Sequence, residues 1–112
     1  MILVAGFFKS TDSFAAATSG ATQESYSAVP DSFSLSVNEV GGTATSWTVV
    51  LEGSNDGVTW VTILTHTQAA PGKGLPIFQA AGVLTPVAYF RTRCTAIVLG
   101  TATSIKATAV GA

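Results

Sequence analysis

Hydrophobic and polar residues alternate along several short stretches of the chain, which is the pattern of half-buried β-strands. In the clearest stretch, serines separate Phe33, Leu35 and Val37. This alternation predicts a strand with one apolar face and one hydroxyl-bearing face. The pair Gly41-Gly42 follows and predicts a turn after this strand.

Residues 46–65 predict a β-hairpin around which the rest of the chain is organised. The first arm alternates apolar and polar residues, and the Asp-Gly pair within the turn at 53–57 suits a tight reversal of the chain. The second arm, from Val58 onward, is apolar on both faces, which predicts a central or covered strand. Strict alternation places Trp60 on the same face of this arm as Leu64.

The longest predicted strand runs from Val87 to Leu99, and residues 104–110 predict a closing strand that pairs back on it. One face of the long strand, with Thr92 among its members, carries Ala88, Phe90, Cys94, Ala96 and Val98. The other face carries Tyr89, Arg91, Arg93 and Thr95. We expect the first face to lie in the core, because it is the more apolar of the two.

The remaining segments give weaker signals. Residues 2–8 predict a strand or an extended arm, and residues 9–30, rich in Ser, Thr and Ala, predict short strands or loop. Residues 68–86 hold three of the four prolines, which predicts a long connection with a short strand at Leu75–Gln79. With no convincing helix, the chain predicts an all-β fold: an antiparallel, jelly-roll-like β-sandwich of seven to nine short strands.

The length of 112 residues fits one domain. We expect residues 1–10 to form an N-terminal arm or edge strand and residues 11–112 to form a single β-sandwich domain. Only 10% of the residues are charged, against about 25% in an average soluble domain. Ser and Thr could solvate the surface, but the low charge better fits a surface partly buried against copies or partners.

Charge and hydropathy also bear on the partners. The net charge is −1, whereas a nucleic-acid partner would need clustered Lys and Arg, so we expect none. No apolar run approaches the roughly 20 residues needed to cross a bilayer, so we expect no membrane partner. The single cysteine excludes an intrachain disulfide and a cysteine-based metal cluster.

No constellation for catalysis, cofactor binding or metal binding is evident, and we expect no enzyme. His66 is the only histidine; it lacks a nucleophile and a second ligand nearby, so we interpret it as a surface or rim residue. Cys94 on an apolar strand face is interpreted as core. Glu52, Asn55 and Asp56 could suggest calcium, but turn chemistry already explains the Asp-Gly pair.

Arg91 and Arg93 share one strand face with Tyr89, and two interpretations stay open. The first is cross-strand ion pairing, with Glu52 as a plausible partner, or a solvated outer face. The second is an arginine-tyrosine patch, because these residue types are enriched at protein interfaces.

Two stretches carry a family resemblance: LEGSNDGVTWVTI, and after a loop AYFRTRCTAIVLGTATSIKATAVGA. Both resemble a pattern in small tailed-phage virion proteins, in particular head decoration or cement proteins of jelly-roll type, over residues 46–67 and 87–111. The resemblance implies a non-enzymatic virion protein on the capsid surface that binds the major capsid protein. It also implies a homo-oligomer, most commonly a trimer, without a cofactor.

The same Asp-Gly-x-x-Trp hairpin occurs in discoidin-like sugar-binding domains, which leaves a glycan-binding or adhesin module of a phage tail or neck as the alternative. Trp47 and Trp60 could stack on sugars, but their apolar strand patterns favour core packing. The predicted contact elements are the arm, the long connection and the arginine strand, with candidate interface residues Ile2, Leu3, Val4, Phe7, Phe8, Leu75, Ile77, Phe78, Tyr89, Arg91 and Arg93.

Overall fold

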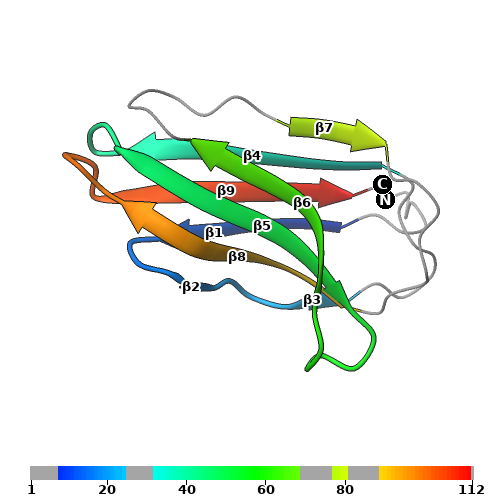
Figure 1. The fold of residues 1–112 in the computed structure, drawn as a ribbon. Helices are drawn as coiled ribbons and strands as arrows, with labels where there is room; N and C mark the ends of the chain where they lie inside the picture. Colours follow the sequence, from blue (N-terminus) through cyan, green and yellow to red (C-terminus); the bar gives the residue numbers. More distant parts are fainter. Residues whose placement is uncertain (1–7, 25–31, 69–76, 81–88, 112) are drawn as a thin grey trace.

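The computed structural model describes residues 8–24, 32–68, 77–80 and 89–111 of the chain (Figure 1). Every regular element in these ranges is a β-strand, so none of their residues forms a helix that could cross a membrane. The strands are β1 (Phe8–Phe14), β2 (Thr18–Ser19), β3 (Gln23–Glu24), β4 (Ser32–Val40), β5 (Ser46–Ser54), β6 (Val61–Gln68), β7 (Ile77–Ala80), β8 (Tyr89–Val98) and β9 (Ser104–Gly111).

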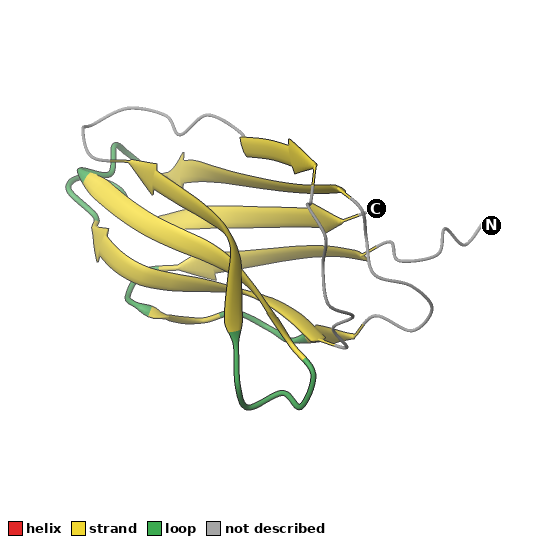
Figure 2. Cartoon of the chain, turned by 45° about the vertical axis from the view of Figure 1, so that its right-hand side comes forward, coloured by secondary structure: helices red, strands yellow, loops and turns green. Residues whose placement is uncertain are grey.

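The strands form two antiparallel sheets that pack face to face, as the two views of the chain show (Figures 1 and 2). The first sheet has the order β1-β9-β4-β7, and the second has the order β2-β8-β5-β6. The short strand β3 also pairs with β8. Since β2 and β3 follow each other along the same edge of β8, they act as one interrupted edge strand.

With β2 and β3 counted together, the pairs of strands are nested around the hairpin of β5 and β6. Strand β4 pairs with β7 outside that hairpin, β2 and β3 pair with β8 outside β4 and β7, and β1 pairs with β9 outermost. Folding such a nest over itself gives two sheets of a jelly roll. The predicted jelly-roll-like sandwich is therefore confirmed, and the hairpin predicted within residues 46–65 is its innermost pair.

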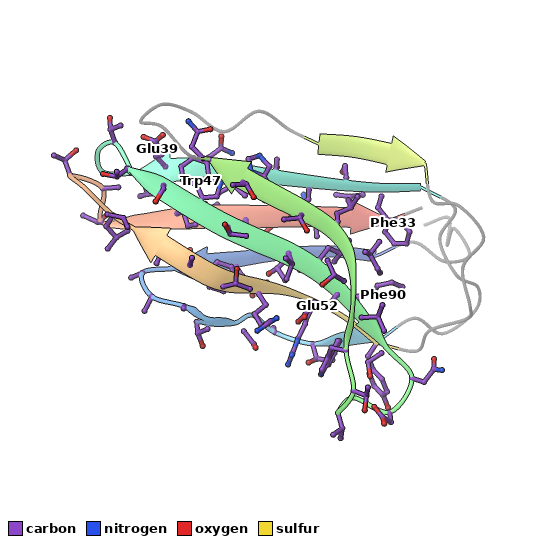
Figure 3. The ribbon with its side chains drawn as sticks, in the orientation of Figure 1. Phe33, Glu39, Trp47, Glu52 and Phe90 are labelled. Atoms are coloured by element: carbon purple, nitrogen blue, oxygen red, sulfur yellow. The ribbon has the colours of Figure 1, made fainter. Side chains whose placement is uncertain are left out.

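The core lies between the sheets and consists of the inward residues of both. On β4 the predicted alternation is confirmed, because Phe33, Leu35 and Val37 are all buried while Ser34 and Ser36 are only partly covered. Figure 3 shows one contact across the sandwich, where Phe33 of β4 meets Phe90 of β8 with ring centroids 5.9 Å apart. Full burial of a large apolar side chain stabilises the fold by about 1.5–3 kcal/mol. The buried cluster is Phe14, Phe33, Leu35, Val37, Ala44, Trp47, Val49, Leu51, Leu64, Phe90, Cys94, Ala102, Ile105, Ala107 and Ala109.

A β-bulge at Thr95 reverses the faces of β8 part-way along its length. Val49 pairs with Cys94 but Thr48 pairs with Ala96, so Thr95 is an extra residue on β8. The predicted inward face is confirmed from Phe90 to Cys94 and is wrong beyond it, while Ala88 lies outside the described residues. There Ala96 is exposed and Val98 is 54% exposed, while the next inward residue, Ile97, packs against the core.

A second irregularity, at Ile63, has the same effect on β6. Leu51 pairs with Leu64 while Glu52 pairs with Thr62, which leaves Ile63 as the extra residue. The shift turns Thr62, and with it Trp60, to the face opposite Leu64. The expectation of a central or covered second arm is also wrong, because β6 lies at the edge of its sheet among the described strands. Val61 at its start is 66% exposed.

The closing strand corrects a further expectation. Strand β9 pairs with β1 and β4 in the first sheet, not with β8, which belongs to the second. The chain changes sheets at Gly100, whose φ of 59° lies in the left-handed region that favours glycine. The amide of Thr101 then donates to the carbonyl of Thr43 at 3.1 Å, which holds the crossing turn against the β4–β5 turn. The short strand predicted near residue 77 exists as β7 and pairs with β4.

A carboxylate links the two sheets along one side of the sandwich. Asp12 Oδ2 on β1 accepts a hydrogen bond from Thr92 Oγ1 on β8 over 2.7 Å. Asp12 Oδ1 accepts another from the amide of Ala21 over 3.0 Å, and the amide of Gly20 donates to the carbonyl of Thr92. Thr92 is completely buried, so Asp12 satisfies a hydroxyl that water does not reach.

Candidate functional site

The outward side of the second sheet carries both arginines of the chain on one strand. Arg91 lies directly opposite Glu52 in the register of β5 and β8. Arg93 follows two residues later on the same face, so both guanidinium groups reach one carboxylate. Tyr89 precedes them on this face, and Trp60 lies over it from the β5–β6 loop. We call this set the arginine face: Glu52, Trp60, Tyr89, Arg91 and Arg93.

The carboxylate of Glu52 is the centre of the arginine face. Its Oε1 accepts hydrogen bonds from Nε of Arg91 at 3.0 Å and from Nε of Arg93 at 3.2 Å. The side chain of Glu52 is 4% exposed, whereas those of Arg91 and Arg93 are 21% and 42% exposed. The predicted cross-strand pairing with Glu52 is therefore confirmed, and the three side chains together leave one positive charge uncompensated.

Trp60 adds an aromatic contact to the ion pair. The guanidinium carbon of Arg91 lies 4.0 Å from the centroid of the Trp60 ring, which is a cation–π distance. Trp60 is partly exposed and does not belong to the buried core cluster. The core interpretation is therefore wrong for Trp60, because the extra residue Ile63 turns it outward. It is confirmed for Trp47, which is buried.

The six residues between β5 and β6, at 55–60, form a loop that projects away from the two sheets (Figure 2). We call it the projecting loop. Asp56 Oδ1 organises it by accepting hydrogen bonds from the amides of Val58 and Thr59, both at 2.8 Å, and from Ser54 Oγ at 3.0 Å. These bonds, from Thr59 first and then Val58 and Ser54, hold the pKa of Asp56 below its ordinary value of 3.8.

The loop lies against the arginine face at Gly57. The φ of Gly57 is 75°, and a methyl group at its Cα would lie 3.9 Å from the Tyr89 ring. Val58 follows with a fixed backbone amide but a side chain that is 80% exposed. The turn prediction for the Asp-Gly pair is confirmed, although the loop is longer than expected and the second strand begins at Val61.

His66 differs most from its predicted position. It is 3% exposed and lies in the interior, where its Nδ1 accepts a hydrogen bond from Nε1 of Trp47 at 3.1 Å. The interpretation of a surface or rim histidine is therefore wrong. Its position on β6 explains the burial, because His66 pairs with the inward residue Val49.

Two other titratable side chains, Cys94 and Glu39, lie within the fold and not at an exposed site. Cys94 is buried, as predicted, and burial raises the pKa of its thiol. Glu39 Oε2 accepts a hydrogen bond from the amide of Ala44 at 3.2 Å, and its buried Oε1 has no hydrogen-bond partner among the described residues. Figure 3 shows Glu39 near Trp47, at the end of the sandwich away from Glu52. Among the described residues no three His, Cys, Asp or Glu side chains gather as a possible metal site.

The remaining candidate interface residues divide into two groups. Phe8 lies at the start of β1, and Ile77 and Phe78 lie in β7, so their backbones are placed in the first sheet. Residue 10 lies inside β1, so this edge strand continues past the predicted boundary of the arm. Those that fall outside the described residues are Ile2, Leu3, Val4, Phe7 and Leu75.

Fold and strand order define the chain as a jelly-roll β-sandwich protein. No protein-family model matches it, and no curated protein does. Among solved structures, the crystal structure of the SPBc2 prophage-derived protein YomS is similar, with a TM-score of 0.51 and 7% sequence identity. That similarity covers 99% of this chain and 100% of the prophage protein. At this identity the likeness is one of fold.

Proposed function

We propose that the chain is a non-enzymatic structural protein of a phage virion, and most specifically a decoration protein of the head. The observation that carries the proposal is the full-length likeness of fold to a prophage-derived protein. The resemblance of the hairpin and of the arginine strand to decoration proteins points in the same direction. In this role the chain binds the major capsid protein on the capsid surface as a homo-oligomer, with a trimer favoured.

The chemistry of the described side chains supports a binding role over a catalytic one. The single histidine is buried with its Nδ1 engaged by Trp47. The buried thiol of Cys94 has a raised pKa, which disfavours the nucleophilic thiolate. Asp56, the exposed carboxylate of the projecting loop, accepts hydrogen bonds that fix the loop. These groups stabilise the fold, whereas the arginine face and the loop present side chains to a partner.

A decoration protein acts by adding buried area between neighbouring capsomers. An interface of about 800 Å² per partner is enough for specific binding. Repetition over the lattice multiplies the effect, because copies that bridge neighbours act at a high effective concentration. The shell would then resist a higher internal pressure from packaged DNA without any chemical step.

We do not favour the glycan-binding alternative as a second function. Trp47 is buried, and one face of Trp60 is covered by Arg91. Stacking on a sugar ring needs an open aromatic face, so the two tryptophans that suggested the alternative offer at most one face. A titration with a broad glycan set that changes tryptophan fluorescence at a defined affinity would favour this alternative.

The test of the proposal uses heads of the phage that encodes the chain, assembled without it. Purified protein is added, and bound and free protein are separated by sedimentation. We expect saturable binding at a fixed ratio to the major capsid protein, and a rise in the temperature at which the heads release DNA. A protein that stays in the supernatant at every concentration would contradict the decoration role.

A further inference from the structure

We propose that the arginine face and the projecting loop form one docking surface for a protein that presents a carboxylate beside an apolar side chain. This inference rests on the proposed virion role and adds the chemistry of the partner. The two parts are continuous, because Gly57 of the loop lies against Tyr89 and Trp60 at the end of the loop lies on Arg91.

The first argument is the charge left over in the arginine face. One carboxylate oxygen of Glu52 accepts hydrogen bonds from Nε of Arg91 and from Nε of Arg93. Among the described residues no group accepts a hydrogen bond from the terminal Nη groups of either arginine. These groups form the end of the guanidinium fork that binds a carboxylate with two parallel hydrogen bonds. Two guanidinium groups against one carboxylate leave a local charge of +1, which an incoming carboxylate would neutralise.

The second argument is that these groups are already ordered. Arg91 is held by Glu52 on its edge and by the Trp60 ring on its face, and Arg93 is held by the same carboxylate. A long arginine side chain normally loses rotamer freedom when it binds. Since these two arginine side chains already lose that freedom when the chain folds, binding a partner costs little further conformational entropy.

The third argument is an exposed apolar side chain beside the charge. Val58, next to Gly57 in the projecting loop, is 80% exposed. The backbone of Val58 is fixed through Asp56, so the loop presents the side chain rigidly. Binding hot spots are enriched in tryptophan, tyrosine and arginine, and surrounding contacts exclude water from them. The arginine face carries all three residue types, and Val58 beside it adds a contact that excludes water.

The described carboxylates favour a different protein over a second copy of this chain. Asp12, Glu39, Glu52 and Asp56 each accept hydrogen bonds within their own chain. A second copy could supply one of these four described carboxylates only by breaking such a contact. A nucleic acid is disfavoured because a local charge of +1 neutralises too few phosphates.

The first experiment tests the chemistry without any phage component. A short synthetic peptide of alternating Glu and Leu is titrated into isotopically labelled protein and followed by NMR, with a Gln-Leu peptide as the matched control. We expect shift changes confined to the arginine face and the projecting loop, and none with the control peptide. Each of three results would overturn the inference: shift changes that are as large at Lys9 and Lys106 as at the proposed surface, equal binding of both peptides, or no shift change at millimolar peptide.

Single substitutions test whether the peptide binds at the proposed docking surface. Arg93→Gln keeps the pair between Glu52 and Arg91, and Val58→Ser removes the apolar side chain without touching the loop amides. We expect Arg93→Gln to weaken peptide binding roughly tenfold and Val58→Ser to weaken it several-fold. Lys106→Gln removes a positive charge from an exposed residue of the opposite sheet, and we expect no loss of binding. Equal losses of peptide binding in Arg93→Gln and Lys106→Gln would show that the peptide responds to positive charge anywhere on the protein, and would overturn the inference.

The second experiment repeats the variants on the decoration-free heads and separates the inference from the proposed function. Weaker binding of Arg93→Gln and Val58→Ser than of wild type and Lys106→Gln supports both. Binding of all four proteins with one affinity overturns the docking surface and leaves the decoration role in place. If wild type ignores the heads but binds the acidic peptide through the arginine face, the decoration role fails and the docking chemistry stands.

Discussion

Trp47 and His66 are joined inside the core by a hydrogen bond of 3.1 Å from the indole Nε1 to the imidazole Nδ1. Their rings are also stacked, with centroids 6.0 Å apart and planes 30° from parallel. Because Nδ1 accepts, the ring proton of His66 is on Nε2. The pair ties the two strands of the central hairpin together on their inward side.

We expect this pair to be coupled in stability. Trp47→Phe removes the donor from a buried acceptor, which costs about 1–3 kcal/mol before the loss of ring volume is added. A double-mutant cycle with His66→Leu should show a coupling energy of about 0.5–3 kcal/mol. Urea denaturation measures the four unfolding free energies, and simple additivity of the two single losses would contradict the coupling.

Replacing Glu52 should destabilise the fold more than replacing either arginine. Glu52→Gln leaves two guanidinium groups close together without their shared counter-charge, so we expect a loss of about 1–3 kcal/mol. This is below the value for a fully buried pair, because both arginines reach water. Arg93→Gln should cost under about 1 kcal/mol, since Arg91 still pairs with Glu52. Added salt should recover part of the Glu52→Gln loss by screening the repulsion, whereas a loss that is independent of salt would argue against a charge effect.

Acid should loosen the projecting loop through Asp56. Its pKa is lowered in the folded state by the loop hydrogen bonds, so its contribution to stability is present above its ordinary value and is lost as the pH falls through the folded value. NMR titration of the carboxyl carbon should give a pKa below 3.8, with the amides of Val58 and Thr59 changing at the same pH. In Asp56→Asn the amides of both residues should lose this titration step; their unchanged response would assign the step to another group.

Two glycines with positive φ should differ in their tolerance of alanine. At Gly57, with φ of 75°, a new methyl group would meet nothing closer than the Tyr89 ring at 3.9 Å, so only the backbone cost of about 1–2 kcal/mol applies. At Gly100 the methyl group would lie 2.7 Å from the carbonyl oxygen of Thr43. Gly100→Ala should therefore lower the thermal midpoint more than Gly57→Ala does. The reverse order would show that the loop around Gly57 is packed more tightly than the sheet-crossing turn.

The contact between Asp12 and Thr92 can be removed from either side, and the two substitutions should destabilise the fold by different amounts. Asp12→Ala leaves the buried hydroxyl of Thr92 without its acceptor and frees the amide of Ala21, so we expect a loss of about 1–3 kcal/mol. Thr92→Val removes the hydroxyl and keeps its shape, and the partly exposed Asp12 can turn to water. Chemical denaturation should therefore show the smaller loss for Thr92→Val, whereas equal losses would indicate that packing dominates at this site.

Local sequence patterns were sufficient to predict most of the strands and their antiparallel arrangement. Phe33, Leu35 and Val37 alternate with serines because one side of β4 faces the core, and that relation needs no knowledge of the rest of the chain. The pairing of Arg91 with Glu52 followed from residue type and the hairpin. The strand order did not follow, because β9 and β8 are adjacent in sequence but belong to different sheets.

The errors in the candidate site have two physical origins, and the first is the β-bulge. A period of two is broken when a strand gains one residue, and neither Ile63 nor Thr95 differs in type from its neighbours in a way that marks a bulge. Each bulge therefore inverted the predicted faces of everything beyond it, which hid the outward position of Trp60. His66 was misplaced because polarity predicted exposure, although a buried partner such as Trp47 can satisfy a ring nitrogen.

The nesting of strand pairs around β5 and β6 also bears on the order in which the chain can fold. The innermost pair closes a loop of a few residues, whereas the outermost pair, β1 with β9, joins residues near opposite ends of the chain. The entropy lost in closing a loop grows with its length, so we expect the hairpin to form first and each outer pair to add to it. A chain dominated by such distant pairings folds slowly, and its last step is the joining of its two ends.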